Sequence, residues 1–286
     1  MGELVWQEGH FSPNTTENEA ATSNASCTEV STNSVAASRP FSNSWCWFLG
    51  LGLGIATQLV FLFTVVQLFM FLRFGAATIA VASENWMYWD FGLAVGFVIP
   101  HSILLVPSVQ QWMRQRIPAA WTGCIHCCVT CVSLLTIFSA WRTTEGGVWL
   151  LTGWWRDICV SCFYGSWVTL FYSLALTGLG YQTGWTPWIN WIRQRRQPKR
   201  TLVTHGAYRL LRHPVYLSFL GLIWFTPHMT WDHVILTGVW TVYIFVGSIA
   251  KDRRLLHYVG DEYREYARRV PGYPLLGWGT LGKWQD

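Results

Sequence analysis

Charged residues are scarce in this chain. Only 12% of its 286 residues are Asp, Glu, Lys or Arg, whereas 51% are hydrophobic and 20 are tryptophan. An ordinary soluble domain carries roughly 25% charged residues. The scarcity excludes such a domain and predicts a protein that buries its surface in lipid, where long continuous apolar runs form helices and not a barrel.

Other features that would define a function class are also missing. No Gly-rich phosphate loop follows a predicted strand, so any cofactor site must be built from helices and their ends. The apolar segments contain almost no charge and no repeated pair of broken helices, which disfavours a transporter or channel. The net charge of +5 comes from loops that flank these segments, which indicates lipid headgroups as neighbours and not nucleic acid.

The beginning of the chain has no apolar segment. Residues 1–44 are rich in Ser, Thr, Asn, Glu and Ala, show no periodicity and do not have the order of regions found in a signal peptide. Such a segment cannot bury enough surface to fold alone. We expect a disordered tail here and a transmembrane domain over 45–286, with its cofactor-binding part at about 201–276.

Long apolar runs predict an all-α integral membrane protein with about five to six transmembrane helices. The expected spans are residues 47–72, 86–106, 120–141 and 158–181, followed by an apolar block at 214–250. That block is too long for one span and is interrupted at 226–230, so it predicts a C-terminal helical hairpin. Pro100 predicts a kink in the second span, and Gly50, Gly52 and Gly54 offer a small packing face on the first.

Two helices are expected outside the hydrocarbon layer. A Trp-rich segment at about 185–192, followed by Arg and Lys, predicts an interfacial helix, and the segment after residue 260 predicts a cytoplasmic amphipathic helix. All Lys and Arg residues except Arg73, Arg142 and Arg156 fall on one face of the membrane in this topology. The positive-inside rule makes that face cytoplasmic, so both termini are expected inside.

Four cysteines follow one stripe of the third span: Cys124, Cys127, Cys128 and Cys131. Their spacing of i, i+3, i+4 and i+7 raises the question of a metal site. Four thiolates on a single helix do not readily close a tetrahedral shell. We therefore expect small apolar packing residues here and no metal.

The densest polar segment leads directly into the hairpin. Tyr208, Arg212 and His213 precede Pro214, which suits the first turn of a helix. Free backbone N–H groups at such a helix start, together with the basic side chains, can receive a carboxylate. Tyr208 and Tyr216 add aromatic faces that can contact a cation.

A second polar cluster, which contains Asp252, follows the hairpin. Because a hairpin returns its two ends to the same face, Asp252 is expected near His213. An anion site beside a carboxylate and tyrosines suits a ligand that carries both a carboxylate and a sulfonium. S-adenosyl-L-methionine is such a ligand.

At these residues the chain resembles the membrane methyltransferases related to isoprenylcysteine carboxyl methyltransferase. The shared pattern is Tyr208, Arg212-His213-Pro214-Val215-Tyr216 and Asp252, and it continues through Gly260, Tyr263, Tyr266 and Arg268-Arg269-Val270-Pro271. Over about residues 86–271, the segments at 100–102, 148–149 and 224–230 look most like methanethiol S-methyltransferases and the nuclear-envelope protein nurim.

The resemblance implies an S-adenosyl-L-methionine-dependent methyltransferase whose cofactor pocket faces the cytoplasm. The cofactor-binding residues it implies are Tyr208, Arg212, His213, Pro214, Tyr216, Asp252, Leu255 and Tyr266. The implied acceptor is a small thiol such as methanethiol, or another lipophilic acceptor, enclosed by the earlier spans. A thiol must lose its proton to react, and His101, Arg253 or bulk base are candidates for assisting that step.

One departure from the family pattern leaves alternatives open. The family usually shows two Glu where this chain has Lys251-Asp252. A carboxyl or lipid methyltransferase on the same scaffold is one alternative. A non-catalytic, nurim-like membrane protein is another, and the altered acidic pair supports it.

Overall fold

The computed structural model describes residues 44–75, 84–144, 146–198 and 201–285. Its helices are α1 (Ser44–Phe74), α2 (Trp86–Ile103), α3 (Pro107–Arg116), α4 (Ala119–Ala140), α5 (Gly153–Thr177), α6 (Leu179–Gln182), α7 (Trp185–Ile192), α8 (Ala207–Leu210), α9 (Pro214–Trp224), α10 (Trp231–Val259) and α11 (Asp261–Arg269). Two short strands are β1 (Gly147–Leu150) and β2 (His228–Thr230). The tail predicted for residues 1–44 lies outside the described residues, except for Ser44 at the start of α1.

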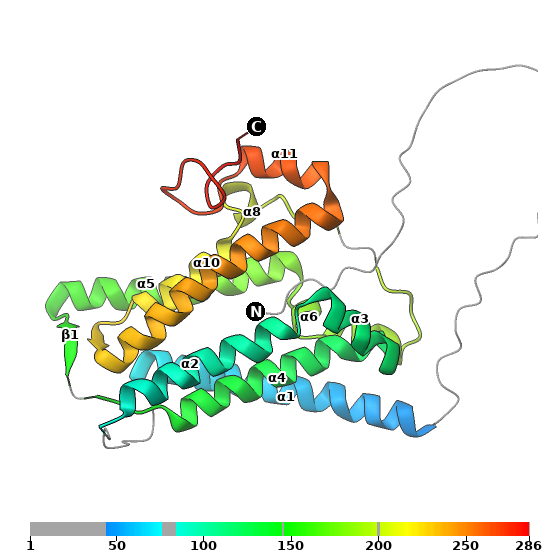
Figure 1. Cartoon of the computed structure of the whole chain (residues 1–286), viewed down its shortest axis with the longest axis horizontal. Coiled ribbons are helices and arrows are strands. Elements are labelled where there is room, and N and C mark those ends of the chain that lie inside the picture. Colours follow the sequence, from blue (N-terminus) through cyan, green and yellow to red (C-terminus); the bar gives the residue numbers. More distant parts are fainter. Residues whose placement is uncertain (1–43, 76–83, 145, 199–200, 286) are drawn as a thin grey trace, which may run out of the picture.

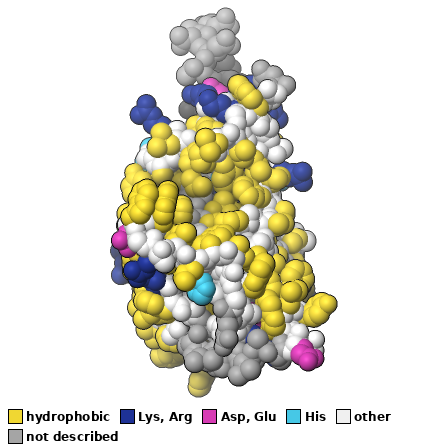
Figure 2. Space-filling view, turned by 90° about the vertical axis from the view of Figure 1, so that its left-hand side faces the viewer, with side chains coloured by type: hydrophobic (Ala, Val, Ile, Leu, Met, Phe, Trp, Pro, Cys, Tyr) yellow, Lys and Arg dark blue, Asp and Glu magenta, His cyan; other side chains and the backbone are white. Residues whose placement is uncertain are grey.

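Four helices are long and apolar enough to cross a membrane: α1, α4, α5 and α10. The pair α2 and α3 makes a fifth when it is taken as one bent span. Apolar side chains cover the outside of these helices, as Figure 2 shows for one face of the molecule. Leu59, Val168 and Val242 are each more than half exposed. Lipid is the solvent that suits such a surface, so the chain is an all-α, multi-pass membrane protein, as predicted.

The spans form two groups that share one core. In the first group α4 packs against α1 and α2, and in the second α9 packs against α5 and α10. Contacts between α10 and α2 join the groups (Figure 1). Aromatic rings fill the junction, for example Phe69 of α1 against Trp167 of α5 at 5.9 Å between ring centroids. The short helices α3, α6 and α7 lie at the opposite end of the long helices from β1 (Figure 1).

The predicted small face of α1 is present, but it uses two of the three glycines. A Cβ placed on Gly54 would lie 1.9 Å from the Trp188 ring, and one on Gly50 would lie 2.5 Å from the Trp191 ring. A Cβ on Gly52 would meet nothing within 4 Å. The indole of Trp188 also donates a hydrogen bond to the carbonyl of Gly50 at 2.6 Å. These contacts anchor the interfacial helix α7 on α1.

Gly54→Leu is therefore expected to destabilise the protein, because the added side chain must displace the buried Trp188 indole. Overpacking of this kind costs about 1–3 kcal/mol. The measurement is the thermal unfolding midpoint in detergent. Gly52→Leu is the matched control on the same helix, and a similar drop for both variants would contradict the packing assigned to Gly54.

The second span bends at a place different from the one predicted. α2 continues through Pro100 and ends at Ile103, and α3 begins at Pro107 after a change of direction of 65°. Pro107 occupies the first turn of α3, where its missing N–H costs nothing. The residue before a proline is disfavoured in the α conformation, and Val106 is extended, so the helix does not continue from α2 into α3.

The fourth span is shifted toward the N-terminus relative to the prediction of 158–181. α5 begins at Gly153 and ends at Thr177 because Gly178 adopts φ +82°, a left-handed conformation that terminates helices. The one-turn helix α6 follows. The shift places the end of α5 beside α8, in the polar segment that precedes the hairpin.

The predicted hairpin is present, and its arms are unequal. α9 has 11 residues, about 16 Å of helix, whereas α10 has 29 residues, about 43 Å. The extended segment 225–230 makes up part of the difference, and its strand β2 pairs antiparallel with β1. This two-stranded sheet was not predicted, because strands of four and three residues give almost no periodic signal. α11 then folds back over the end of α10 (Figure 1).

Candidate functional site

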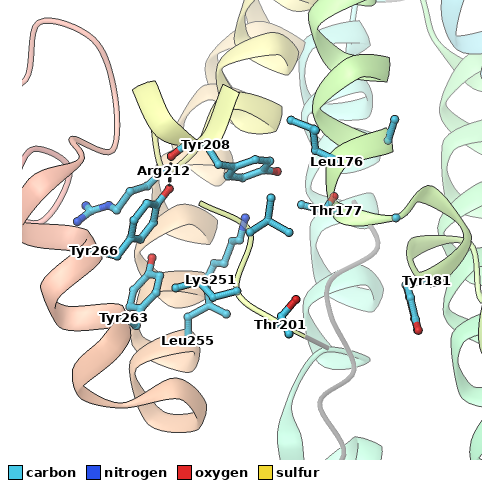
Figure 3. A pocket seen from close by; sticks show the side chains of 14 residues that line it. Leu176, Thr177, Tyr181, Thr201, Tyr208, Arg212, Lys251, Leu255, Tyr263 and Tyr266 are labelled. Carbon is cyan, nitrogen blue, oxygen red and sulfur yellow. Dashed lines mark hydrogen bonds between the residues drawn. The ribbon is translucent and has the colours of Figure 1, made fainter. Parts of the chain in front are cut away.

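A polar pocket of about 280 Å³ lies where the hairpin begins and ends. This volume is near the lower end of the range for small-molecule sites, roughly 300–1,000 Å³. One wall comes from α8, α10, α11 and the residues between them, the other from the end of α5 with α6, and residues 201–203 close the space between them (Figure 3). Its lining residues are Ala175, Leu176, Thr177, Gly178, Tyr181, Thr201, Leu202, Val203, Tyr208, Arg212, Lys251, Leu255, Tyr263 and Tyr266.

Tyrosine hydroxyl groups hold one wall of the pocket together. Tyr266 donates to the carbonyl oxygen of Tyr208 at 2.6 Å (Figure 3), and Tyr263 donates to Oδ1 of Asp252 at 2.5 Å. Burial raises the pKa of Tyr263 and of Tyr266 above the ordinary value, and nearby acidic groups add to the shift. Both hydroxyls therefore stay protonated near neutral pH and act as hydrogen-bond donors, not as bases.

Behind this wall lies a buried charge cluster of Arg212, His213 and Asp252. Arg212 Nη2 lies 3.1 Å from Asp252 Oδ2, and His213 Nε2 lies 3.1 Å from Asp252 Oδ1. The sequence prediction that Asp252 lies near His213 is confirmed. Burial lowers the pKa of His213, against the opposing effect of the Asp252 carboxylate, so the imidazole is neutral at neutral pH. One guanidinium and one carboxylate make the cluster neutral as a whole.

Arg212 also ties the C-terminal segment to the hairpin. Its Nη1 donates to the carbonyl of Ala267 at 3.1 Å, and its Nη2 donates to the carbonyl of Thr280 at 3.0 Å. The guanidinium lies 5.2 Å from the ring of Trp284. Figure 3 shows the same group turned away from the pocket. The charged end of Arg212 therefore stabilises the fold around the pocket.

Lys251 is the cation that points into the pocket. It is half-buried, and Figure 3 shows its side chain directed between the two walls. Its Nζ lies 5.9 Å from the ring centroid of Tyr208 and 5.4 Å from that of Tyr216. Among the described residues that line the pocket, Lys251 and Arg212 are charged and none is a carboxylate. The pocket therefore favours a ligand with an anionic group.

The residues predicted to bind the cofactor fall into two groups in the structure, those that line the pocket and those that do not. Four line the pocket: Tyr208, Arg212, Leu255 and Tyr266. The other four, His213, Pro214, Tyr216 and Asp252, are buried and are not among the lining residues. Arg253 is exposed and does not line the pocket either. The free carboxylate-binding helix start expected at His213 and Pro214 is thus covered by protein.

Sequence reasoning missed much of the opposite wall. Thr177 and Gly178, at the end of α5, line the pocket, as does Thr201. Gly178 was available as a signal, since glycine commonly follows the last helical residue. Tyr263 was noted only within the family pattern, although its spacing of three from Tyr266 places both rings on one face of a helix.

A second, apolar cavity of about 140 Å³ lies among the spans. It is bounded by residues of α1, α2, α4, α5, α6, α9 and α10, with Thr183 beside α6. None of the described residues that line it is Lys, Arg, Asp or Glu. Leu174, Leu179, Gln182 and Thr183 line this cavity, whereas Ala175 through Gly178 line the polar pocket. A single segment therefore separates the two spaces. Gln182 crosses it with a hydrogen bond from Nε2 to Thr177 Oγ1 at 2.8 Å.

His101 belongs to this apolar region and not to the polar pocket. It is buried, its Nδ1 lies 3.1 Å from Thr130 Oγ1, and its ring stacks on Phe97 at 5.3 Å between centroids. The ring of His126 lies 4.9 Å away, between centroids, and His126 lines the cavity. His101 and Arg253, predicted together as candidates for proton transfer, therefore lie in different surroundings.

The cysteine stripe of α4 packs against neighbouring segments and the cavity. Cys128 Sγ lies 3.1 Å from Thr57 Oγ1 of α1, and Cys124 Sγ lies 3.7 Å from the carbonyl oxygen of Gly184. Cys127 and Cys131 line the apolar cavity. Within the described ranges, no group of three or more His, Cys, Asp or Glu side chains is placed to hold a metal ion.

The fold and the two adjoining spaces define a multi-pass membrane protein with a polar site at one end of its spans, and curated relatives agree. The chain is 27% identical over 233 residues to methanethiol S-methyltransferase 1 of Bradyrhizobium diazoefficiens, covering 78% of this chain and 81% of the relative. It is 28% identical over 189 residues to the methanethiol S-methyltransferase of Mycobacterium tuberculosis, covering 64% and 74%.

Nurim of Mus musculus is 25% identical over 166 residues, which cover 54% of this chain and 63% of nurim. No family model and no solved structure matches the chain significantly. The relatives confirm the resemblance to methanethiol S-methyltransferases and nurim, and the names of the longer matches indicate a methyltransferase.

Proposed function

We propose that this protein is an S-adenosyl-L-methionine-dependent methyltransferase that methylates the sulfur of a small thiol such as methanethiol. The observation that carries the proposal is the juxtaposition of a cationic, tyrosine-lined pocket with an apolar cavity across one segment, in a chain similar to methanethiol S-methyltransferases over most of its length. The polar pocket takes the cofactor and the cavity takes the acceptor.

The pocket residues fit the chemical groups of the cofactor. Lys251 offers an ammonium to a carboxylate, and the faces of Tyr208 and Tyr266 suit an adenine ring or a cationic sulfonium. Leu176, Leu202 and Leu255 supply apolar surface for the remaining atoms. When bound, the cofactor supplies an activated methyl group. The protein's part is to hold both reactants in line and to exclude water.

Charge distribution supports a cytoplasmic pocket. Arg114 belongs to α3, and Arg193, Arg195 and Arg196 directly follow α7; α3 and α7 lie at the same end of the bundle as α6 (Figure 1). Arg142 and Arg156 stand within a few residues of β1 in the chain, and β1 lies at the far end. We extend the positive-inside rule to place the pocket and both termini in the cytoplasm. The cofactor then enters from the aqueous side and the acceptor from the membrane.

Calorimetric titration of the detergent-purified protein with S-adenosylmethionine tests the proposal. We expect micromolar binding, followed by transfer of a labelled methyl group to methanethiol in the presence of the cofactor. A carboxylic acid or phospholipid that accepts the label while thiols do not would favour the carboxyl or lipid methyltransferase. Folded protein that binds no cofactor would contradict the proposal.

A non-catalytic, nurim-like protein remains the second candidate, because Lys251 stands where the family pattern has a glutamate. Lys251→Glu distinguishes the candidates. If the protein is a methyltransferase that uses Lys251 to bind the cofactor, this variant loses cofactor affinity. If the protein is a non-catalytic relative in which lysine has replaced a cofactor-binding glutamate, the variant gains cofactor affinity. The same titration measures both outcomes.

A further inference from the structure

The apolar cavity contains a histidine that cofactor binding does not use. His126 lines the cavity and is 9% exposed, and its Nε2 has no hydrogen-bond partner among the residues that the structure describes. A buried polar atom without a partner costs about 1–3 kcal/mol. A ligand in the cavity that donates a hydrogen to Nε2 would remove this cost.

His126 lies near the end of the cavity that adjoins the cofactor pocket. Two residues before it, Cys124 contacts the carbonyl of Gly184, the residue after Thr183 in the separating segment. Along a helix two residues rise only about 3 Å. The His126 imidazole is therefore close to the level of Thr183 and Gln182, which line the same cavity, and Gln182 contacts Thr177 of the pocket.

The titratable groups that face His126 from neighbouring elements are few. His101 of α2 contacts it ring to ring, Tyr243 of α10 lines the cavity and packs on His101, and Cys127 and Cys131 of α4 itself also line the cavity. No lysine, arginine, aspartate or glutamate is among the described lining residues. A neutral imidazole is the strongest proton acceptor on this wall.

The volume of the apolar cavity indicates the size of the methyl acceptor. The cavity volume is about 140 Å³, and an apolar cavity of about 150 Å³ is large enough to bind benzene. Methanethiol, with two heavy atoms, would fill a small part of it. Phe97, Leu134, Trp167, Phe219 and Ile244 contribute to the apolar lining, which favours the burial of further carbon atoms.

We propose that the cavity binds apolar thiols larger than methanethiol, carrying a ring or an alkyl chain of several carbons, and that His126 is the catalytic residue that accepts the thiol proton. This inference rests on the proposed function. The S–H bond breaks and its proton moves to Nε2. The sulfur electron pair forms a bond to the cofactor's methyl carbon, and the electrons of the broken carbon–sulfonium bond stay on the cofactor sulfur. The protonated imidazole then returns its proton to water.

His126→Gln in the full-length protein tests the role of the imidazole with two acceptors. For hexanethiol, which is mostly protonated at neutral pH, we expect kcat/KM to fall about 100-fold, the lower end of the range for general base catalysis. For 4-nitrobenzenethiol, which is already ionised, we expect less than about a threefold change, because no proton must be removed. A purely structural role would lower both rates together.

His233→Gln is the matched control. His233 is a half-buried histidine whose Nε2 lies 3.0 Å from the carbonyl oxygen of Ile223, and it is not among the described residues that line the cavity. We expect both rates to remain unchanged. Affinity for S-adenosylhomocysteine, measured on each variant, shows that the cofactor pocket is intact. An equal loss with both thiols, or no loss with either, would overturn the role of His126.

The wild-type protein tests the acceptor class independently of any variant. From methanethiol to hexanethiol, kcat/KM should rise by up to about fourfold per added methylene, the gain for full burial of that group. Turnover of methanethiol alone would overturn the larger acceptor and leave the proposed function standing. Cofactor binding without turnover of any thiol would overturn the proposed thiol methylation and this inference together.

Discussion

Asp252→Ala is expected to lower the stability of the C-terminal part of the protein by about 3–5 kcal/mol, the cost of leaving a buried charge without its partner. The carboxylate contacts Arg212 and His213 and accepts a hydrogen bond from Tyr263. Its loss leaves the Arg212 guanidinium buried without a counter-charge. We also expect cofactor binding to be lost, because Tyr263 forms part of the pocket wall. Limited proteolysis and thermal unfolding in detergent measure the two effects.

Asp261→Ala is the control for this prediction. Asp261 pairs with Arg264 at 2.8 Å, but the two side chains are 91% and 51% exposed. An exposed pair contributes little to stability, so this variant should match the wild type. Asp252→Ala protein that resists protease as well as the wild type, and still binds the cofactor, would contradict the structural role of the cluster.

Lys251→Gln is expected to weaken S-adenosylmethionine binding by about 10- to 100-fold, the value of a hydrogen bond to a charged group. Lys251 is the cation directed into the pocket, whereas the charge of Arg212 is used by Asp252 and by backbone carbonyls. The loss should be small for decarboxylated S-adenosylmethionine, because that ligand has no carboxylate for Lys251 to bind. Calorimetry with the two ligands measures the difference.

Arg253→Gln is the control, since Arg253 adjoins Lys251 in the chain but is exposed and outside the pocket. We expect its affinity for both ligands to equal that of the wild type. If Lys251→Gln weakens the two ligands equally, Lys251 shapes the pocket and does not bind the carboxylate. If Lys251→Gln strengthens binding, the lysine opposes the sulfonium.

Local patterns explain how much of the fold was predictable. Continuous apolar runs placed α1 and α4 within a few residues of their observed positions, because hydropathy alone decides a membrane span. They also placed the start of α10, but this helix continues through a polar segment to Val259, beyond the predicted end at residue 250. The strand β2 depends on pairing with β1, which is distant in the chain, whereas the bend before Pro107 has a local signal in the proline itself. The 11-residue α9 matches the part of the apolar block that precedes the predicted interruption at 226–230, and it is too short to cross the hydrocarbon layer by itself.

The site was predictable where helix geometry alone determined it. A hairpin required Asp252 to meet His213, and the two residues do meet. Adjacent helical residues point about 100° apart, so Lys251 had to face a different direction from Asp252, and this could have been read from the sequence. The orientation of Arg212 could not, because its partners are backbone carbonyls: that of Ala267 near the end of α11 and that of Thr280 in the irregular segment after α11.

The contacts of Arg212 also bear on biosynthesis. Membrane insertion proceeds from the N-terminus, so all the spans are made before Thr280 and Trp284, which complete the surroundings of the guanidinium. Until then the Arg212 guanidinium lacks one of its hydrogen-bond acceptors, the carbonyl of Thr280, and its aromatic neighbour Trp284. A nascent chain with every span in the bilayer therefore holds an unfinished pocket until synthesis has passed Thr280 and Trp284.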